Sequence, residues 1–412
     1  MLGLLLTGSS LFAACSTDVN MKTLGGDAGA TGDAGAKGDG GEAGAPEYVF
    51  PARLNAQTVL VPSATPDTAT QLLVAGTDYT STEVVNVTLG TGALSNAKTY
   101  ADGDTIPVSS GGLGFTIERG ASDKVNLLDG GKISTTFDLS DVGTGTAPVD
   151  SKAYVPFYNQ SLVAVLDLAE GKVSRRIDLS EFNAKGDADH SADITGAVYD
   201  PKKKIAYFLL QRIDLVALKA DPAFQLHCSA TKALVVGIDA TTDKVIDVNG
   251  AAAGKAIELS LANPSSISIN ADGDTLYVGA KGCYEGTSLK QQGLEVVDLS
   301  DGTSQLDYGP ADSDGISKVI TIGGNLALIQ TQDAAFANHW FTLDIAAMAL
   351  QGGELTLPDA VSFDGKDLIG VQVTGKVGAV VRYDIATATT KVISKTSWAG
   401  KYDTAYGTAL VQ

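Results

Sequence analysis

The sequence predicts an all-β repeat protein, on three observations. A short apolar segment that ends in Asp or Asn recurs seven times. The anchoring residues are Asn86, Asp129, Asp167, Asp239, Asp298, Asp344 and Asp384. The anchors are 43, 38, 72, 59, 46 and 40 residues apart, and a period near forty with strand-like content is typical of repeat architectures. The 412-residue chain contains 47 Gly and no strongly periodic amphipathic helix, as expected for strands joined by turns.

The N-terminal residues set the expected compartment. Residues 1–14 are apolar and small and lead to Cys15, which resembles a bacterial lipobox, where a signal peptide is cleaved and the cysteine is acylated. No Lys or Arg precedes the apolar run, so either the true start lies upstream or the signal is atypical. The alternative is an ordinary signal peptide in which Cys15 is incidental. The resemblance implies a membrane partner through the lipid anchor, in the bacterial cell envelope, as an outer-membrane lipoprotein or cell-surface protein.

A glycine-rich linker follows the cysteine over residues 15–47. Glycine occupies every third position from Gly26 to Gly44, which gives seven Gly-X-Y triplets with a single proline, Pro46. Collagen requires this spacing, but triplets so poor in proline should not hold a triple helix by themselves. We therefore expect a disordered, flexible tether rather than a trimerising stalk.

Residues 48–412 carry the repeats, and each repeat can be written as four short strands. The clearest unit has apolar strands over 153–158, 162–167 and 172–179, separated by polar or glycine turns. The Asp that ends the third strand, Asp167 in this unit, can accept backbone N–H groups of the following turn. Seven four-stranded antiparallel units around a ring leave few exposed edges, so the sequence predicts a seven-bladed β-propeller.

The same unit carries a family resemblance. Ala153-Tyr154-Val155, followed by Val165-Leu166-Asp167-Leu168 and Gly171-Lys172-Val173, resembles the YVTN-type β-propeller repeat of bacterial surface proteins. The similarity covers about residues 66–412 and is clean in units three, five and seven. It implies a seven-bladed propeller and no particular activity. Some seven-bladed relatives are lactonases, but their active-site residues cannot be placed on this chain one by one.

Ring closure can also be predicted. The first unit has good second and third strands, at 71–75 and 83–86, but a doubtful first one. A strand-like segment at 405–411 stands alone after the seventh unit. We expect this C-terminal segment to supply the innermost strand of blade one. The alternative donor is Thr58-Val59-Leu60-Val61.

Long insertions mark where function is expected. In a four-stranded antiparallel blade, the loop between strands two and three lies on the same face as the link between blades. The insertions fall in that loop in blades four (211–232), five (281–292) and six (332–339). Binding is usually found in such loops, although neutral drift of loop length is the alternative. Cys228 and Cys283 lie in two of these loops, and in an exported protein we expect a disulfide rather than two free thiols.

Polar side chains gather on the same predicted face. The candidate binding residues are His190, His227, His339, Asp187, Asp189, Asp193 and Tyr284. Imidazoles and carboxylates together could hold a transition metal or serve as acid and base. The alternative is that they are ordinary polar residues, placed where the loops are longest. No cofactor is predicted, and a divalent cation is left open.

The net charge and the absence of catalytic motifs reduce the number of function classes that fit the sequence. A formal charge of −19 argues against a nucleic-acid partner, because no basic stripe is present to contact phosphates. The sequence contains no Gly-x-Ser-x-Gly, Walker, His-Glu-x-x-His or Cys-x-x-Cys motif. We expect a monomeric envelope lipoprotein whose propeller binds a protein or glycan partner through its looped face. The alternative is a propeller enzyme, lactonase-like or a metal-dependent hydrolase, that uses the central mouth.

Overall fold

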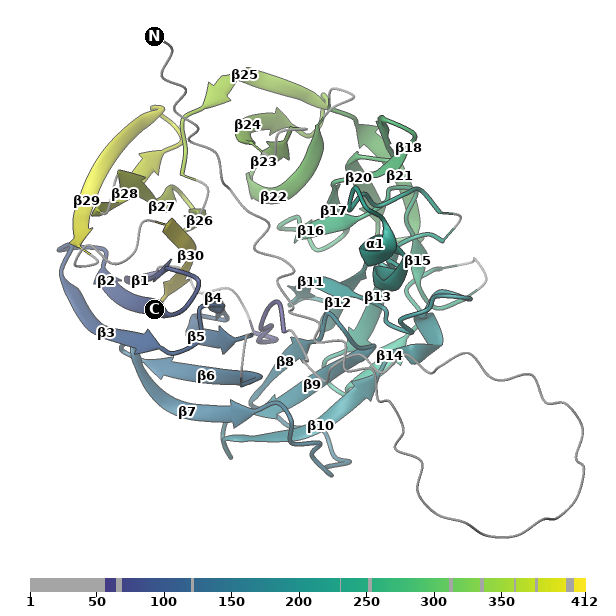
Figure 1. Ribbon diagram of the computed structural model, residues 1–412, viewed down its shortest axis with the longest axis horizontal. Coiled ribbons are helices and arrows are strands. Elements are labelled where there is room, and N and C mark those ends of the chain that lie inside the picture. Colours follow the sequence, from purple (N-terminus) through teal and green to yellow (C-terminus); the bar gives the residue numbers. More distant parts are fainter. Residues whose placement is uncertain are drawn as a thin grey trace, which may run out of the picture. The chain divides into compact units, whose positions relative to one another are not determined.

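The computed structural model describes residues 56–63, 69–119, 122–229, 231–250, 254–310, 314–333, 337–358, 361–374, 377–397 and 404–412. The predicted signal peptide, Cys15 and the Gly-X-Y tether lie outside these residues, so those predictions are not addressed by the structure. Within the unit Arg53–Gln412, the described residues form a seven-bladed β-propeller of antiparallel sheets arranged around a central axis (Figure 1). The predicted fold class is confirmed.

The first three blades contain most of the N-terminal half of the ring. Blade 1 contains β1 (Gln71–Thr77), β2 (Thr82–Thr88), β3 (Leu94–Tyr100) and the C-terminal β30 (Thr404–Val411). Blade 2 contains β4 (Thr105–Ser110), β5 (Leu113–Glu118), β6 (Lys124–Asp129) and β7 (Lys132–Asp138). Blade 3 contains β8 (Lys152–Pro156), β9 (Leu162–Asp167) and β10 (Lys172–Asp178). A short 3-10 turn, η1 (Ser180–Phe182), follows blade 3.

The remaining blades continue around the ring in chain order. Blade 4 contains β11 (Ile194–Asp200), β12 (Ile205–Leu210), β13 (Leu234–Asp239), β14 (Lys244–Ile246) and the short β15 (Ile257–Glu258). Blade 5 contains β16 (Pro264–Ile269), β17 (Thr275–Ala280), β20 (Gly293–Asp298) and β21 (Thr303–Tyr308). Blade 6 contains β22 (Gly315–Gly323), β23 (Leu326–Gln332), β24 (Asn338–Asp344) and β25 (Ala349–Leu355). Blade 7 contains β26 (Val361–Phe363), β27 (Leu368–Thr374), β28 (Val377–Asp384) and β29 (Thr389–Ser397).

Both ends of the described chain complete a blade. The C-terminal β30 pairs antiparallel with β1, with Val74 opposite Thr408, and takes the inner edge of blade 1 as the sequence predicted. The alternative donor is wrong for blade 1, because Thr58–Val61 lies against blade 3. There Leu60 and Tyr154 exchange two backbone hydrogen bonds of 2.8 Å. Blade 3 contributes only three strands of its own, so the expectation of four strands within that unit is corrected: the fourth position is filled from the N-terminal side.

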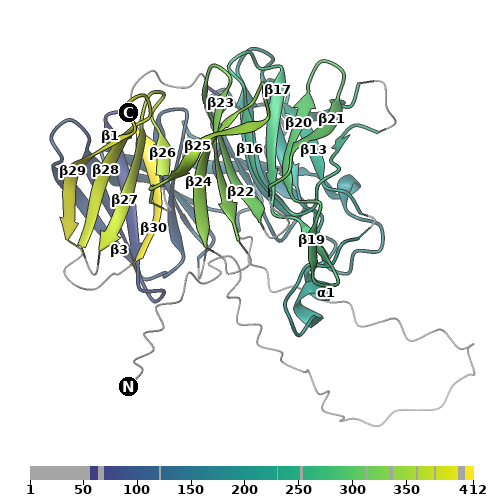
Figure 2. The ribbon, with the colours of Figure 1, turned by 90° about the horizontal axis from the view of Figure 1, so that it is seen from above.

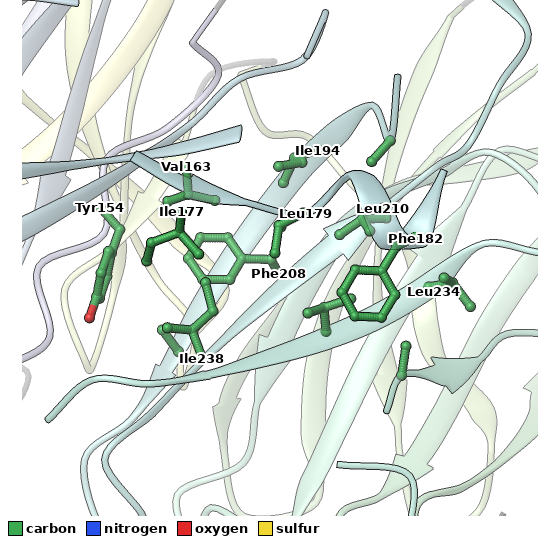
Figure 3. Close-up of a cluster of buried hydrophobic side chains, with 14 of the residues drawn as sticks. Tyr154, Val163, Ile177, Leu179, Phe182, Ile194, Phe208, Leu210, Leu234 and Ile238 are labelled. Atoms are coloured by element: carbon green, nitrogen blue, oxygen red, sulfur yellow. The ribbon is translucent and has the colours of Figure 1, made fainter. Parts of the chain in front are cut away.

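The core is divided between the blades. Seven clusters of buried hydrophobic side chains occur in the described residues, one between each pair of neighbouring blades. Strand alternation produces this division, since successive side chains point to opposite faces of a sheet. In β9, Val163 and Val165 pack toward blade 4, whereas Ala164 and Leu166 pack toward blade 2. Figure 3 shows the blade 3–4 cluster around Phe208.

The repeated Asp residues hold the turns after the third strands. The Oδ1 atom of Asp167 accepts hydrogen bonds from the N–H groups of Ala169 (3.0 Å) and Glu170 (2.9 Å). The same contact recurs at four later anchors: Asp239, Asp298, Asp344 and Asp384. At the first anchor the amide of Asn86 instead donates to Gln71 of the neighbouring strand. The structural role predicted for the Asp residues is therefore confirmed at five of the seven positions.

A buried polar contact fastens blade 3 to blade 4. The carboxylate of Asp243, in the β13–β14 turn, is fully buried and lies 2.8 Å from the Lys152 ammonium. The Tyr154 hydroxyl and the Arg175 guanidinium also donate to Asp243. Both carboxylate oxygens therefore have donors, as a buried charge requires.

Candidate functional site on the loop face of blade 4

The face that carries the inter-blade links and the loops between second and third strands is here named the loop face. The blade 4 loop, residues 211–233, contains the six-residue helix α1 (Leu215–Ala220). The blade 5 loop, residues 281–292, folds as a hairpin of β18 (Cys283–Glu285) and β19 (Ser288–Lys290). The two loops project together beyond the blades (Figure 2). The predicted blade 6 insertion is shorter than expected, because β24 begins at Asn338 and so includes His339.

The two projecting loops are joined covalently. Cys228 and Cys283 form a disulfide with their Cα atoms 4.9 Å apart, which confirms the pairing expected from the sequence. Backbone hydrogen bonds flank it: Tyr284 N–H donates to Leu226 (2.8 Å), and Cys228 N–H donates to Tyr284 (3.2 Å). Tyr284, a predicted binding residue, thus pairs the loops through its backbone, and its side chain is half-buried. These contacts restrict the blade 4 loop more than its single short helix could.

The link between blades 3 and 4 carries the predicted carboxylates, and it fastens to the blade 4 loop. The Oδ2 atom of Asp189 accepts from the N–H of Leu215 (2.7 Å), and Oδ2 of Asp193 accepts from Ile213 (2.8 Å). Asp214 caps α1 by accepting from the N–H of Ala217 (2.9 Å), as N-cap residues do. Carboxylates of the link and of the loop therefore meet.

Three of these side chains form a tight acidic cluster. Asp187, Asp189 and Asp214 each place one carboxylate oxygen within 4.8 Å of the others. Burial, with the neighbouring Asp187 charge, raises the pKa of Asp189 to about 7. Burial also raises the pKa of Asp187 and holds that of Asp193 well above its usual range. Burial and the nearby negative charges thus disfavour full ionisation of the link carboxylates Asp187, Asp189 and Asp193.

Compensation of these carboxylates is incomplete. Asp187 is 5% exposed and Asp193 is fully buried, yet Asp187 Oδ2 and Asp193 Oδ1 have no hydrogen-bond partner. Among the described residues, no Lys, Arg or His forms an ion pair with either of them, nor with Asp189 or Asp214. The guanidinium of Arg212 interacts electrostatically with Asp187, and it donates hydrogen bonds to the carbonyls of Lys232 (2.8 Å) and Asn183 (3.3 Å).

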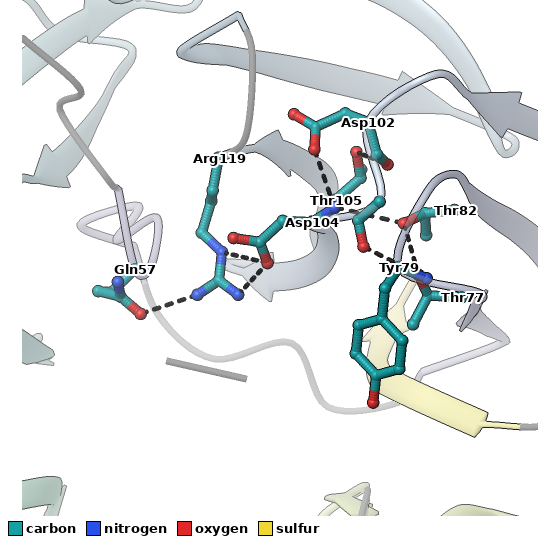
Figure 4. A network of polar contacts seen from close by, with 9 residues as sticks. Gln57, Thr77, Tyr79, Thr82, Asp102, Asp104, Thr105 and Arg119 are labelled. Atoms are coloured by element: carbon teal, nitrogen blue, oxygen red, sulfur yellow. Dashed lines mark hydrogen bonds and ion pairs between the residues drawn. The ribbon is translucent and has the colours of Figure 1, made fainter. Parts of the chain in front are cut away.

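The link between blades 1 and 2 shows the opposite arrangement on the same face (Figure 4). Arg119 donates through Nε to Asp104 Oδ1 (3.2 Å) and forms an ion pair with it. The same guanidinium donates through Nη1 to Gln57 Oε1 (3.0 Å). Asp102 accepts from the N–H of Asp104 (2.8 Å). An acidic link on this face can therefore be completed by a cation from its own chain.

A cavity adjoins the acidic cluster. It has a volume of 330 Å³ and is lined by residues of the blade 3–4 link, the blade 4 loop and the start of the blade 5 hairpin. The wall includes Asp187, Asp214, His227 and both cysteines. Its volume is at the lower end of small-molecule sites, and its lining includes the charged side chains of Asp187, Arg212 and Asp214.

The three histidines do not converge. His227 Nε2 lies 2.7 Å from Asp221 Oδ2 within the blade 4 loop. His339 lies 2.9 Å from Glu354 and 3.6 Å from Asp333 in blade 6, and its hydrogen bond to Glu354 raises its pKa. The carbonyl of His190 accepts from the Asn183 amide (2.6 Å). In the described part of the chain, the group with metal-ligand spacing contains carboxylates only, including Asp214, which the sequence analysis missed.

Comparisons with known proteins identify the fold and no family. No protein-family model matches the chain, and no curated protein matches it in sequence. A solved structure from Lactobacillus plantarum has a TM-score of 0.53 at 11% identity, covering 84% of this chain and 100% of that one. A "putative 6-phosphogluconolactonase" from Bacteroides fragilis has a TM-score of 0.52 at 13% identity, covering 85% and 99%. Likeness at this identity shows a shared propeller architecture and carries no activity over.

None of the helices in the described residues combines the length and the apolar character needed to span a bilayer.

Proposed function

We propose that this chain is a monomeric bacterial cell-envelope protein, anchored through a lipid on Cys15, that binds a protein or glycan partner with its loop face. The lipobox-like N-terminus and the Gly-X-Y linker support the anchor and the tether. The resemblance to YVTN-type repeats of bacterial surface proteins supports display at the cell surface, on the outer membrane.

The observation that carries the binding proposal is the pair of projecting loops joined by the Cys228–Cys283 disulfide. A loop that is already restrained loses less conformational entropy when it binds, so more of the contact energy remains as affinity. The loop also presents an aromatic side chain, Phe224, that is 42% exposed. Aromatic residues are enriched at interfaces and often provide a large share of binding energy.

Site-specific crosslinking tests this proposal. A photo-reactive phenylalanine analogue replaces Phe224 in bacteria that produce the full chain. A matched variant carries the analogue at Val392, which is 52% exposed on β29, an outer strand of blade 7. We expect discrete adducts from position 224 and none from position 392. For a glycan partner, the purified chain is applied to an array of bacterial glycans, and Phe224→Ser is expected to lose at least about tenfold in retention.

Two outcomes would overturn the proposal. One is equal crosslinking from both positions, which would indicate collision rather than recognition. The other is the absence of adducts at position 224 together with glycan retention that Phe224→Ser leaves unchanged.

A further inference from the structure

We propose that Asp187, Asp189 and Asp214 form a binding site for a divalent cation of the calcium type, at the junction of the blade 3–4 link and the blade 4 loop. A cation at this junction would hold the loop face together whatever partner that face binds.

The spacing of the carboxylates fits one ion. Their three oxygen atoms lie within 4.8 Å of one another. Two oxygens bound to the same Ca²⁺ can be separated by at most about 4.6–5.2 Å, twice the usual ion–oxygen distance. For Mg²⁺ the corresponding limit is about 4.0–4.2 Å, with a stricter octahedral arrangement. Carboxylates are the preferred ligands of both ions, and the adjoining 330 Å³ cavity leaves room for water ligands.

Burial distinguishes this cluster from the exposed acidic groups that are common without an ion. Asp187 is 5% exposed, yet its Oδ2 atom has no hydrogen-bond donor. Behind the cluster, the fully buried Asp193 also has an oxygen without a donor. Leaving such an acceptor buried and unsatisfied costs about 1–3 kcal/mol or more for a charged group. A bound cation would provide the missing charge for the cluster.

The surrounding groups support a cation rather than an internal counter-charge. Lys185 and Arg212 line the cavity, but among the described residues neither forms an ion pair with a carboxylate of the cluster. Two guanidinium nitrogens of Arg212 donate to backbone carbonyls instead. His227 and His339 pair with carboxylates outside the cluster, and His190 contributes an electrostatic interaction with Asp187 but, within the described part of the chain, no ion pair.

A cation at this point would join two elements of the ring. Asp187 and Asp189 come from the link that leaves blade 3, and Asp214 begins the helix of the blade 4 loop. Binding would therefore stiffen the base of the loop, while the disulfide restrains its far side at blade 5. The cation and the disulfide would then restrain the loop face at two separate points.

The test uses the full chain and the metal alone. Purified protein is freed of divalent ions with chelator, then titrated with CaCl₂ and separately with MgCl₂ by isothermal calorimetry at neutral pH. We expect one Ca²⁺ per chain, weaker Mg²⁺ binding, and a Ca²⁺-dependent rise in the thermal unfolding midpoint. Hydrogen exchange should slow in residues 183–193 and 211–220, and stay unchanged in β29 of blade 7.

Variants locate the ion. Asp189→Asn and Asp214→Asn keep side-chain size and should each weaken Ca²⁺ binding by at least about tenfold. The control Asp150→Asn removes the same charge from an exposed carboxylate outside the cluster and should bind Ca²⁺ like the native chain. The proposal is overturned if the native chain shows no Ca²⁺ binding. It is also overturned if both cluster variants bind Ca²⁺ as tightly as the Asp150→Asn control. Slowed exchange without stoichiometric binding would also count against it.

Discussion

Blades 3 and 4 are joined by buried carboxylates at both of their ends, and the two ends differ. At one end Asp243 receives donors from Lys152, Tyr154 and Arg175. At the other end, on the loop face, Asp187 and Asp193 are equally buried, but each keeps an oxygen without a partner. The same pair of blades thus contains one completed polar junction and one incomplete junction.

The two junctions point to different roles, one structural and one functional. A buried carboxylate is costly unless charge and hydrogen bonds compensate it, and Asp243 is compensated entirely by residues of its own chain. The link carboxylates receive backbone N–H groups, which fix their positions but do not neutralise them. An arrangement that fixes carboxylates in place without neutralising them is expected where an external cation or a proton completes the site.

The largest expected effect comes from breaking the completed junction. Asp243→Ala leaves the Lys152 and Arg175 charges partly buried without a counter-ion, which should lower the free energy of unfolding by about 3–5 kcal/mol. Urea denaturation followed by circular dichroism measures the change. Asp150→Ala, on an exposed carboxylate, should stay within about 0.5 kcal/mol of the native chain. A loss below about 1 kcal/mol at Asp243 would show that the junction contributes little.

Opening the disulfide should have the next largest effect, and a local one. A Cys228→Ser, Cys283→Ser double variant should lose about 2–4 kcal/mol in the free energy of unfolding, because two positions separated by 55 in the sequence are no longer cross-linked in the unfolded chain. Hydrogen exchange should accelerate most in residues 211–229 and 281–292, and less in the blade strands. Exchange that accelerates equally throughout the ring would contradict a role centred on the loop face.

The incomplete junction should respond to pH in the metal-free protein. Asp189 has a pKa of about 7 in the fold, above its ordinary value of 3.8, and faces Asp187 and Asp193. The folded state therefore binds more protons than the unfolded state between these values. Stability should fall as pH rises from about 4 to about 7, by at most about 1.4 kcal/mol per pH unit for one proton.

Chemical denaturation at several pH values in chelator measures this slope. Asp189→Asn removes one titrating group and should make the slope between pH 4 and 7 shallower, while Asp187 and Asp193, whose pKa values are also raised, still contribute. Asp150→Asn should leave the slope unchanged. If Asp189→Asn keeps the native slope, the pH dependence must arise elsewhere in the chain.

How far the sequence predicts this molecule depends on how local each signal is. The Asp anchors mark blades because each acts on the turn directly after it, as at Asp167 and Asp239. The place of Leu60 in blade 3 could not be predicted, since it pairs with Tyr154 far along the chain. A short apolar segment fits the inner edge of any blade, and only three-dimensional closure selects one.

The candidate site was predicted in part for the same reason. Asp187, Asp189 and Asp193 stand together in one link, so their meeting is a local property of the sequence. Asp214 was missed because α1, with six residues, is too short to show helical periodicity, although Asp before Leu215 is a capping signal. The sequence indicates only that the three histidines share one face of the propeller. That face spans seven blades, so sharing it does not by itself bring the side chains together.

The smallest expected effect concerns His339, whose positive charge between two carboxylates is lost as the pH rises. His339 lies between Glu354 and Asp333, and the hydrogen bond to Glu354 raises its pKa above 6.5. Its stabilising charge is therefore fully present below pH 6.5 and is lost as pH rises through the raised value. Because the pair is partly exposed and screened by salt, it should contribute about 0.2–1 kcal/mol. His339→Gln should reduce the fall in stability above pH 6.5 and leave the change between pH 4 and 6 intact. This separates a carboxylate pair with its own cation from the acidic cluster, whose response begins at lower pH. If His339→Gln alters the lower window instead, the two regions are coupled through the ring.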